Sequence, residues 1–135
     1  MEAAQRFLEA KERFPVGSVN WARATAEAFT MLADEACAEV AKPEWWNDEG
    51  LKALSKRVVR VAPNDGLANA MRALVLRSGC GTWLAGPRSA AELKEAATHY
   101  ERAAALHPAP AMQAQLAEKA AWCHSLVSQW QSDVV

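Results

Sequence analysis

The chain has 135 residues, of which 51% are hydrophobic, and its 15 basic and 16 acidic side chains give a formal net charge of −1 at neutral pH. This balance excludes the overall positive excess that drives binding to nucleic acid or to an anionic membrane surface. The length suits one globular domain, and no apolar run approaches the roughly 20 residues that a bilayer-spanning helix needs.

The chain is rich in residues that favour helix, and prolines and glycines divide it into about six helical segments. We predict these segments over residues 2–13, 20–41, 49–61, 66–77, 89–107 and 109–131. No segment alternates between polar and apolar residues as a strand does. Mostly short turns make consecutive helices antiparallel neighbours. The sequence therefore predicts a single all-α domain over residues 1–135.

Local signals mark several of these boundaries. Pro63 ends the third segment, and Asp65 is a suitable N-cap for the fourth. Ser89 and Glu92 have the spacing of a capping box, in which each side chain binds a free backbone N–H at the start of the fifth helix. Pro110 is tolerated at the start of the sixth helix because the first helical position has no N–H bond to lose.

Three segments end with one residue pattern, at spacings of 4, 3 and 5 residues. It occurs as Ala3, Phe7, Ala10, Pro15; as Ala96, Tyr100, Ala103, Pro108; and, with weaker chemistry, as Leu51, Ser55, Val58, Pro63. The order small residue, aromatic, small residue, proline is typical of the second helix of a tetratricopeptide repeat. Small residues let paired helices approach closely, the ring fills the gap to the next pair, and proline ends the helix.

The chain therefore resembles the tetratricopeptide-repeat family over nearly its whole length. The resemblance implies antiparallel helix hairpins stacked as a short α-solenoid, whereas a generic helical bundle is the alternative. The pattern departs from the family in its period, because the terminal prolines lie 48 and 45 residues apart instead of about 34. Asn69 and Ala114 also stand where the family favours an aromatic residue.

The family binds peptides on the inner faces of the first helices of its hairpins. Carried over by position, this groove comprises Val19, Ala22, Ala26, Phe29, Leu67, Ala70, Leu74, Arg77, Met112, Gln115, Lys119 and Trp122. It is mainly apolar, which suits an amphipathic helix or a hydrophobic peptide. The Lys and Asn pattern with which some members hold a C-terminal carboxylate is absent. The alternative is that the last helix or a neighbouring chain covers these positions as core.

A basic stripe, defined by Lys52, Lys56 and Arg60, follows one face of the third predicted helix. The stripe either binds an acidic peptide, an acidic tail or a phosphate group, or it is an ordinary face exposed to solvent. Residues 1–50 carry 5 basic and 10 acidic side chains, whereas residues 51–90 carry 7 basic and 1 acidic. Association of the acidic first third of one molecule with the basic middle of another would give a homo-oligomer.

Three tryptophans, Trp45, Trp46 and Trp83, fall in predicted links or loops, where they either anchor a partner or fold back onto the core. The three cysteines form no disulfide framework, so we expect reduced thiols in the cytoplasm. Cys80, between two glycines of the 78–88 loop, is the candidate for a reactive thiol. No closely spaced Cys or His pair and no phosphate-binding loop occurs, so we expect neither metal nor cofactor.

These observations predict a non-catalytic interaction or scaffold module that binds a protein or peptide, and the basic stripe suggests an acidic one. We expect no nucleic acid and no membrane as partner. Two alternatives stay open: a structural or oligomer-forming subunit of a larger assembly, and a thiol-dependent enzyme that uses Cys80.

Overall fold

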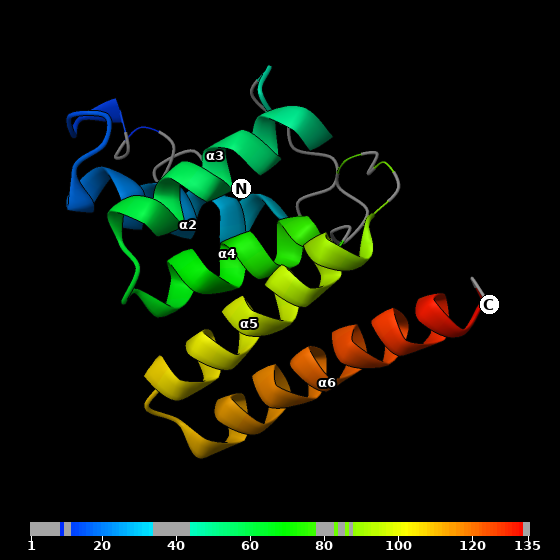
Figure 1. Ribbon diagram of the computed structural model, residues 1–135. Helices are drawn as coiled ribbons and strands as arrows, with labels where there is room; N and C mark the ends of the chain where they lie inside the picture. Colours follow the sequence, from blue (N-terminus) through cyan, green and yellow to red (C-terminus); the bar gives the residue numbers. More distant parts are fainter. Residues whose placement is uncertain are drawn as a thin grey trace.

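The computed structural model describes residue 9 and residues 12–33, 44–77, 83, 86 and 88–133, with side chains up to residue 129. This part of the chain is all-helical and contains no strand, as predicted (Figure 1). Its helices are α2 (Val19–Ala33), α3 (Asp48–Val61), α4 (Gly66–Leu76), α5 (Ala90–Leu106) and α6 (Pro110–Asp133). The first predicted segment, with Phe7, lies almost wholly outside the described residues. No described helix is long and apolar enough to cross a bilayer.

The last four helices begin and end within two residues of their predicted bounds. For α2 the prediction extended to residue 41, and the residues after Ala33 lie outside the described part. Two of the predicted caps form: Asp65 accepts a hydrogen bond from Ala68 N at 3.0 Å, and Ser89 and Glu92 make the reciprocal capping box. At the start of α3, Asn47 accepts from Gly50 N at 2.8 Å, a cap that the sequence analysis had left within an irregular link.

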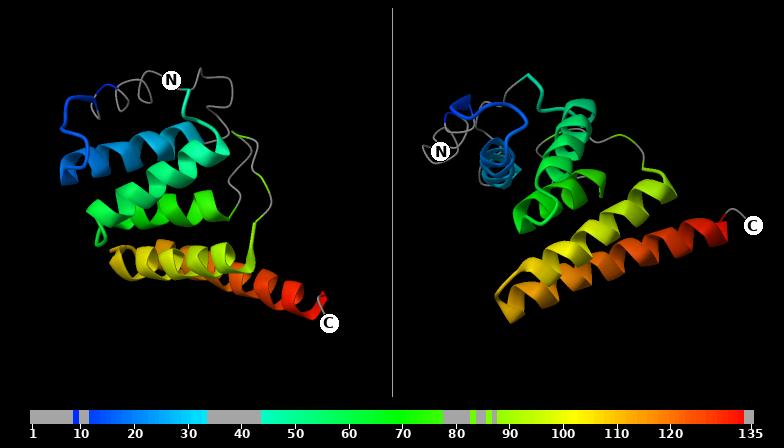
Figure 2. Two further views of the ribbon diagram at one scale, coloured as in Figure 1. Left: turned by 45° about the horizontal axis from the view of Figure 1, so that its top comes forward. Right: turned by 60° about the vertical axis from the view of Figure 1, so that its left-hand side comes forward.

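The helices pack as neighbours in chain order, with one additional contact between α2 and α4 (Figures 1 and 2). Within the described residues, α5 lies between α4 and α6, and α6 packs on α5 alone. Figure 2 shows α6 running along α5 with its C-terminal end reaching beyond the other helices. As a result α4 and α6 stand on either side of α5, and within the described residues their backbones do not approach each other closely.

Two buried apolar clusters hold these helices together. The first joins α2, α3 and α4, and the second joins α4, α5 and α6. Helix α4 contributes to both, with Met71 and Val75 in the first cluster and Ala73 and Leu76 in the second. The repeated pattern falls within the packed interfaces: Leu51, Ser55, Val58, Ala96, Tyr100 and Ala103 are all buried.

Two of the loop tryptophans belong to the first cluster. Trp46 and Trp83 are buried, their ring centroids are 5.9 Å apart in an edge-to-face arrangement, and each lies within about 6 Å of Phe29 (5.4 and 6.0 Å). Trp45 is half-buried and packs against the same cluster. The packing interpretation of these tryptophans is therefore confirmed for Trp46 and Trp83, whose rings extend the core beyond the helices themselves.

Candidate functional site

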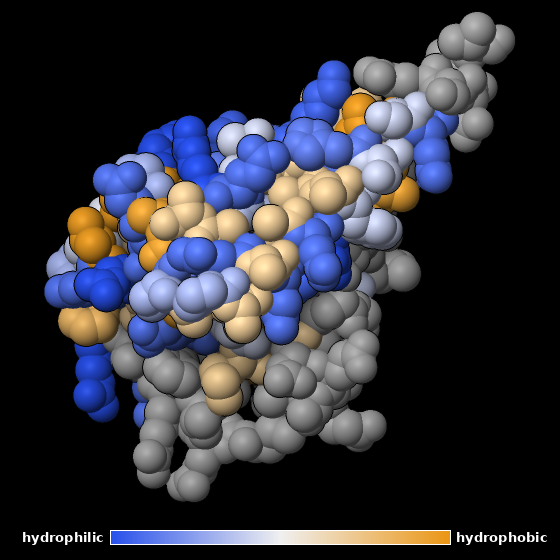
Figure 3. Space-filling model, turned by 90° about the horizontal axis from the view of Figure 1, so that it is seen from below, coloured by the Kyte–Doolittle hydropathy of each residue, from blue (hydrophilic) through white to orange (hydrophobic). Residues whose placement is uncertain are grey.

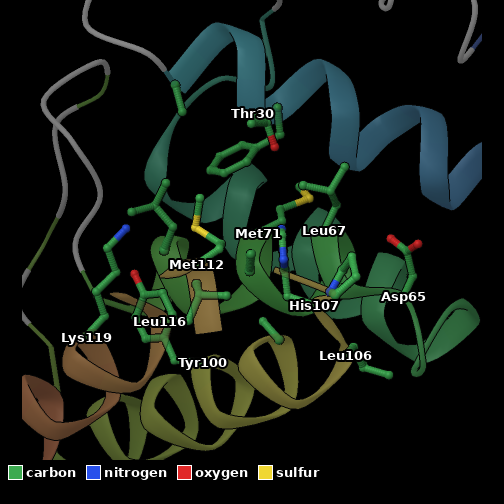
Figure 4. A pocket seen from close by; sticks show the side chains of 17 residues that line it. Thr30, Asp65, Leu67, Met71, Tyr100, Leu106, His107, Met112, Leu116 and Lys119 are labelled. Atoms are coloured by element: carbon green, nitrogen blue, oxygen red, sulfur yellow. The ribbon is translucent and has the colours of Figure 1, made fainter. Parts of the chain in front are cut away.

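A groove of about 690 Å³ opens between α4 and α6 (Figure 4). Helix α5 closes it from below, and the C-terminal half of α2 borders it on the other side. Its lining comprises Phe29, Thr30, Ala33, Asp65, Gly66, Leu67, Ala70, Met71, Leu74, Tyr100, Ala103, Leu106, His107, Pro108, Met112, Leu116 and Lys119. The groove exists because α4 and α6 both pack on α5 without packing on each other.

The middle of the groove is apolar and accessible. Leu67 on α4 and Met112 on α6 are 40% and 38% exposed, although both are large apolar side chains. Met71 and Leu116 lie deeper, and both are buried. Methionine is flexible and polarisable, so a surface with two methionines can adapt to apolar groups of different shape. This part of the groove can therefore bury apolar side chains of a ligand.

One end of the groove is cationic, and we call it the Arg77–Lys119 end. A second hollow of about 360 Å³ adjoins it, lined by Arg77, Gln115, Glu118, Lys119 and Trp122, so that Lys119 lines both. The Arg77 guanidinium lies over the Trp122 ring, 5.3 Å from its centroid. Trp122 is 47% exposed. Within the described part of the chain, neither Arg77 nor Lys119 takes part in an ion pair.

Tyr100 brings a hydroxyl group to the same end. The residue is only 2% exposed, and its hydroxyl has no hydrogen-bond partner among the described residues. Figure 4 shows the Tyr100 hydroxyl and the Lys119 ammonium directed toward the same end of the groove. Burial raises the pKa of Tyr100 to about 12, so the phenol stays protonated and keeps a donor that no described residue accepts from.

The opposite end is polar, and its polar side chains already bind groups within the protein. Asp65 caps α4 and lies 3.6 Å from Arg23 as an ion pair. His107 Nδ1 accepts from Ala109 N at 3.1 Å. The groove therefore has one end whose polar groups are used within the protein and one end with unpaired cations.

No protein-family model, curated protein or solved structure matched the chain.

The structure gathers half of the positions expected in the groove by resemblance. Phe29, Leu67, Ala70, Leu74, Met112 and Lys119 line it, and Arg77, Gln115 and Trp122 line the adjoining hollow with Lys119. Three positions were wrong. Ala22 and Ala26 are fully buried in the first cluster, because that face of α2 is covered, and Val19 is exposed outside the groove.

Met71, Tyr100 and Leu116 also line the groove, although they were not predicted as groove residues. The repeated pattern of small, aromatic and small residues before a proline predicts that the Tyr100 ring packs between hairpins, and Tyr100 is buried as expected. It also lines the groove because none of the described helices covers the gap between α4 and α6 above it. No pattern in the sequence predicts the open space between α4 and α6.

The basic stripe is partly neutralised. Lys52 Nζ lies 2.7 Å from the Glu92 carboxylate of α5 and 3.9 Å from Asp48. Burial opposes ionisation of Glu92, but the hydrogen bonds from Lys52 and from Ser89 N outweigh it and lower the pKa of Glu92. Lys56 and Arg60 are exposed on the outer face of α3, away from the groove. The stripe and the groove are thus separate surfaces.

A buried polar cluster links α3, α4 and α5. Arg72 Nε donates to Glu95 at 2.9 Å, and its Nη1 donates to Ser55 Oγ and to the Lys52 carbonyl. His99 Nε2 lies 3.3 Å from Glu95, and its Nδ1 lies 2.9 Å from Asn69 Oδ1. Burial lowers the pKa of His99, against the attraction of Glu95. Since each member is held by partners, this cluster serves to position the helices.

A second buried pair joins the start of α3 to the end of α4. The Arg88 guanidinium donates to both Asp48 oxygens and to the carbonyls of Val75 and Leu76 at the C-terminal end of α4. Asp48 also accepts from Gly86 N and Trp83 Nε1. The hydrogen bonds from Arg88 lower the pKa of Asp48 to about 2, despite its partial burial.

Of the three cysteines, only Cys123 lies within the described residues. Cys37 and Cys80 are outside the described residues. Cys123 is a free, buried cysteine on α6, and burial raises the pKa of its thiol, which disfavours the reactive thiolate. Among the residues that the structure describes, no three His, Cys, Asp or Glu side chains group as metal ligands would.

Proposed function

We propose that the chain is a non-catalytic interaction module that binds an apolar peptide or an amphipathic helix of another protein in the groove between α4 and α6. The observation that carries the proposal is the groove itself. It is about 690 Å³ in volume and exposes large apolar side chains, Leu67 and Met112, from two helices whose described backbones stay apart. Accessible apolar surface of this kind marks ligand and partner sites.

We further infer a tetratricopeptide-like arrangement in which α2 pairs with α3 and α4 pairs with α5. The burial of the repeated small and aromatic positions supports it, as does the contact between α2 and α4, the first helices of the two pairs. Helix α6 would be the first helix of a third pair. In this arrangement the missing contact between α4 and α6 is what widens the groove. The free thiol of Cys123 suits the cytoplasm.

The test places a charge in the groove. Leu67→Glu and Met112→Glu change exposed side chains of the groove, and Val19→Glu is the matched control, because Val19 is also a large apolar side chain, 54% exposed, but lies outside the groove. Peptides selected from a random display library on the wild-type chain would serve as probes, with affinity measured by fluorescence anisotropy.

Each groove variant is expected to weaken these peptides at least tenfold, since one buried apolar side chain contributes about 1.5–3 kcal/mol. The control is expected to bind like the wild type. The proposal fails if no peptide binds saturably, or if the selected peptides bind both groove variants as tightly as the wild type.

A second candidate function is a structural subunit whose groove is filled by a neighbouring copy. One observation favours it: among the described helices α6 packs on α5 alone, and it exposes Trp122. Light scattering at low and high salt separates the two candidates. An assembly that persists at micromolar concentration and dissociates in Met112→Glu would support the subunit. A constant monomer mass would leave the interaction module.

A further inference from the structure

We infer that the segment bound in the groove carries an acidic side chain, which binds at the Arg77–Lys119 end while the apolar side chains of the segment lie over Leu67, Met71 and Met112. This inference rests on the proposed function and adds to it the chemistry and the direction of the ligand.

The first argument is charge. The hollow at this end is lined by two basic side chains, Arg77 and Lys119, and by one acidic side chain, Glu118. Neither cation has an ion-pair partner in the described part of the chain, whereas Lys52, Arg72 and Arg88 each bind a carboxylate. An anionic group is therefore the complement that this end lacks, and apolar surroundings strengthen its attraction.

The second argument is preorganisation. Arg77 is the C-cap residue of α4, and its guanidinium is held over the Trp122 ring. A guanidinium fixed by stacking loses less freedom when it binds, and its planar set of N–H donors matches the two oxygens of a carboxylate. Lys119 reaches the site from α6, so that a bound carboxylate would bridge the two helices that border the groove.

The third argument is the unused donor of Tyr100. A buried hydroxyl without a partner is unfavourable, and a ligand acceptor would remove that cost. Because this hydroxyl is buried, it can donate to a ligand carboxylate only when the side chains above it move apart on binding. Lys119, which is exposed, lies toward the same end as this hydroxyl. The three groups together form one anion-binding end of an otherwise apolar groove.

The opposite end fixes the direction. The Asp65 carboxylate lines it and is paired with Arg23, so a ligand carboxylate placed there would have to compete with Asp65 for that cation. The acidic side chain of the ligand therefore lies over the α4 C-terminus and the middle of α6. The apolar residues then extend toward Leu67 and Leu106.

The experiment uses the full chain and C-terminally amidated peptides selected from a random library, so that the only carboxylates are side chains. Selection on the wild type is expected to enrich Asp or Glu at one edge of an apolar pattern. Lys119→Glu is expected to weaken such a peptide on the order of tenfold. Changing the acidic residue of the peptide to Lys should restore binding to the variant. Lys94→Glu, an exposed lysine of α5 outside both hollows, is the matched control.

The outcomes separate the two proposals. Peptides that bind, that are weakened by Leu67→Glu, and that show neither an acidic preference nor a response to Lys119→Glu would overturn the inference and leave the groove as the binding site. Peptides that bind only with a free C-terminal carboxylate would also overturn it, since the group would then be a chain end. Absence of any groove-dependent peptide would overturn the proposed function and this inference together.

Discussion

The hydroxyl of Tyr100 is a polar group that the free protein buries without a partner. We predict that Tyr100→Phe leaves the free energy of unfolding unchanged or raises it by about 1 kcal/mol, because the substitution removes an unsatisfied group and keeps the ring. Chemical denaturation checks this, with Tyr100→Ala expected to lose about 3–5 kcal/mol through the cavity that it leaves. A loss above 1 kcal/mol in the Phe variant would show that the hydroxyl has a partner in the free state.

Asp48 makes the stability depend on acid. Its pKa is about 2 in the folded protein against 3.8 ordinarily, so the folded state holds the carboxylate and gains stability that is complete above pH 4. We predict a loss of about 2 kcal/mol as the pH falls from 4 to 2. Urea unfolding across this window measures it.

The Asp48→Asn variant supplies the control for this dependence. It is expected to be less stable at neutral pH, because the buried Arg88 guanidinium loses its anionic partner. The part of the pH dependence that Asp48 causes is expected to disappear. An unchanged slope between pH 4 and 2 would assign the effect to other carboxylates.

At the scale of single helices, the caps decide where the helices begin. We predict that Ser89→Ala destabilises the protein by about 1 kcal/mol, because α5 loses the hydroxyl that accepts from Glu92 N at 3.1 Å. Ser128→Ala, at an exposed position of α6, is the matched control and should change stability little. Equal stability of both variants would mean that the cap is replaced by water.

The helices could be predicted from the sequence because their signals are local. Asp65 and Ser89 bind backbone groups three residues away, and Pro63 and Pro110 stand at helix ends. The partners that set the helix packing are distant in sequence: Asp48 meets Arg88, and Lys52 meets Glu92, each across 40 residues. No periodicity reports such pairs. For the same reason, the sequence predicts several residues that line the apolar groove. It does not predict the open space between α4 and α6.

At the scale of the molecule, α6 has the fewest neighbouring helices. Within the described residues it packs on one helix, whereas α4 packs on three. We predict that the amides of α6 exchange with solvent faster than those of α4 and α5, since local opening exposes fewer buried contacts. Hydrogen exchange followed by mass spectrometry measures this. Equal protection of α6 and α4 would instead indicate that a second copy covers α6, and would favour the structural subunit.

Helix α4 has side chains in both buried clusters, which has a consequence for how the protein loses its structure. Neither cluster can unfold while the other stays intact, because the loss of either one would remove about half of the contacts of α4. Heat should therefore unfold α2 to α5 in one calorimetric transition, with the van't Hoff and calorimetric enthalpies in agreement. A helix placed between two cores in this way makes them a single cooperative unit.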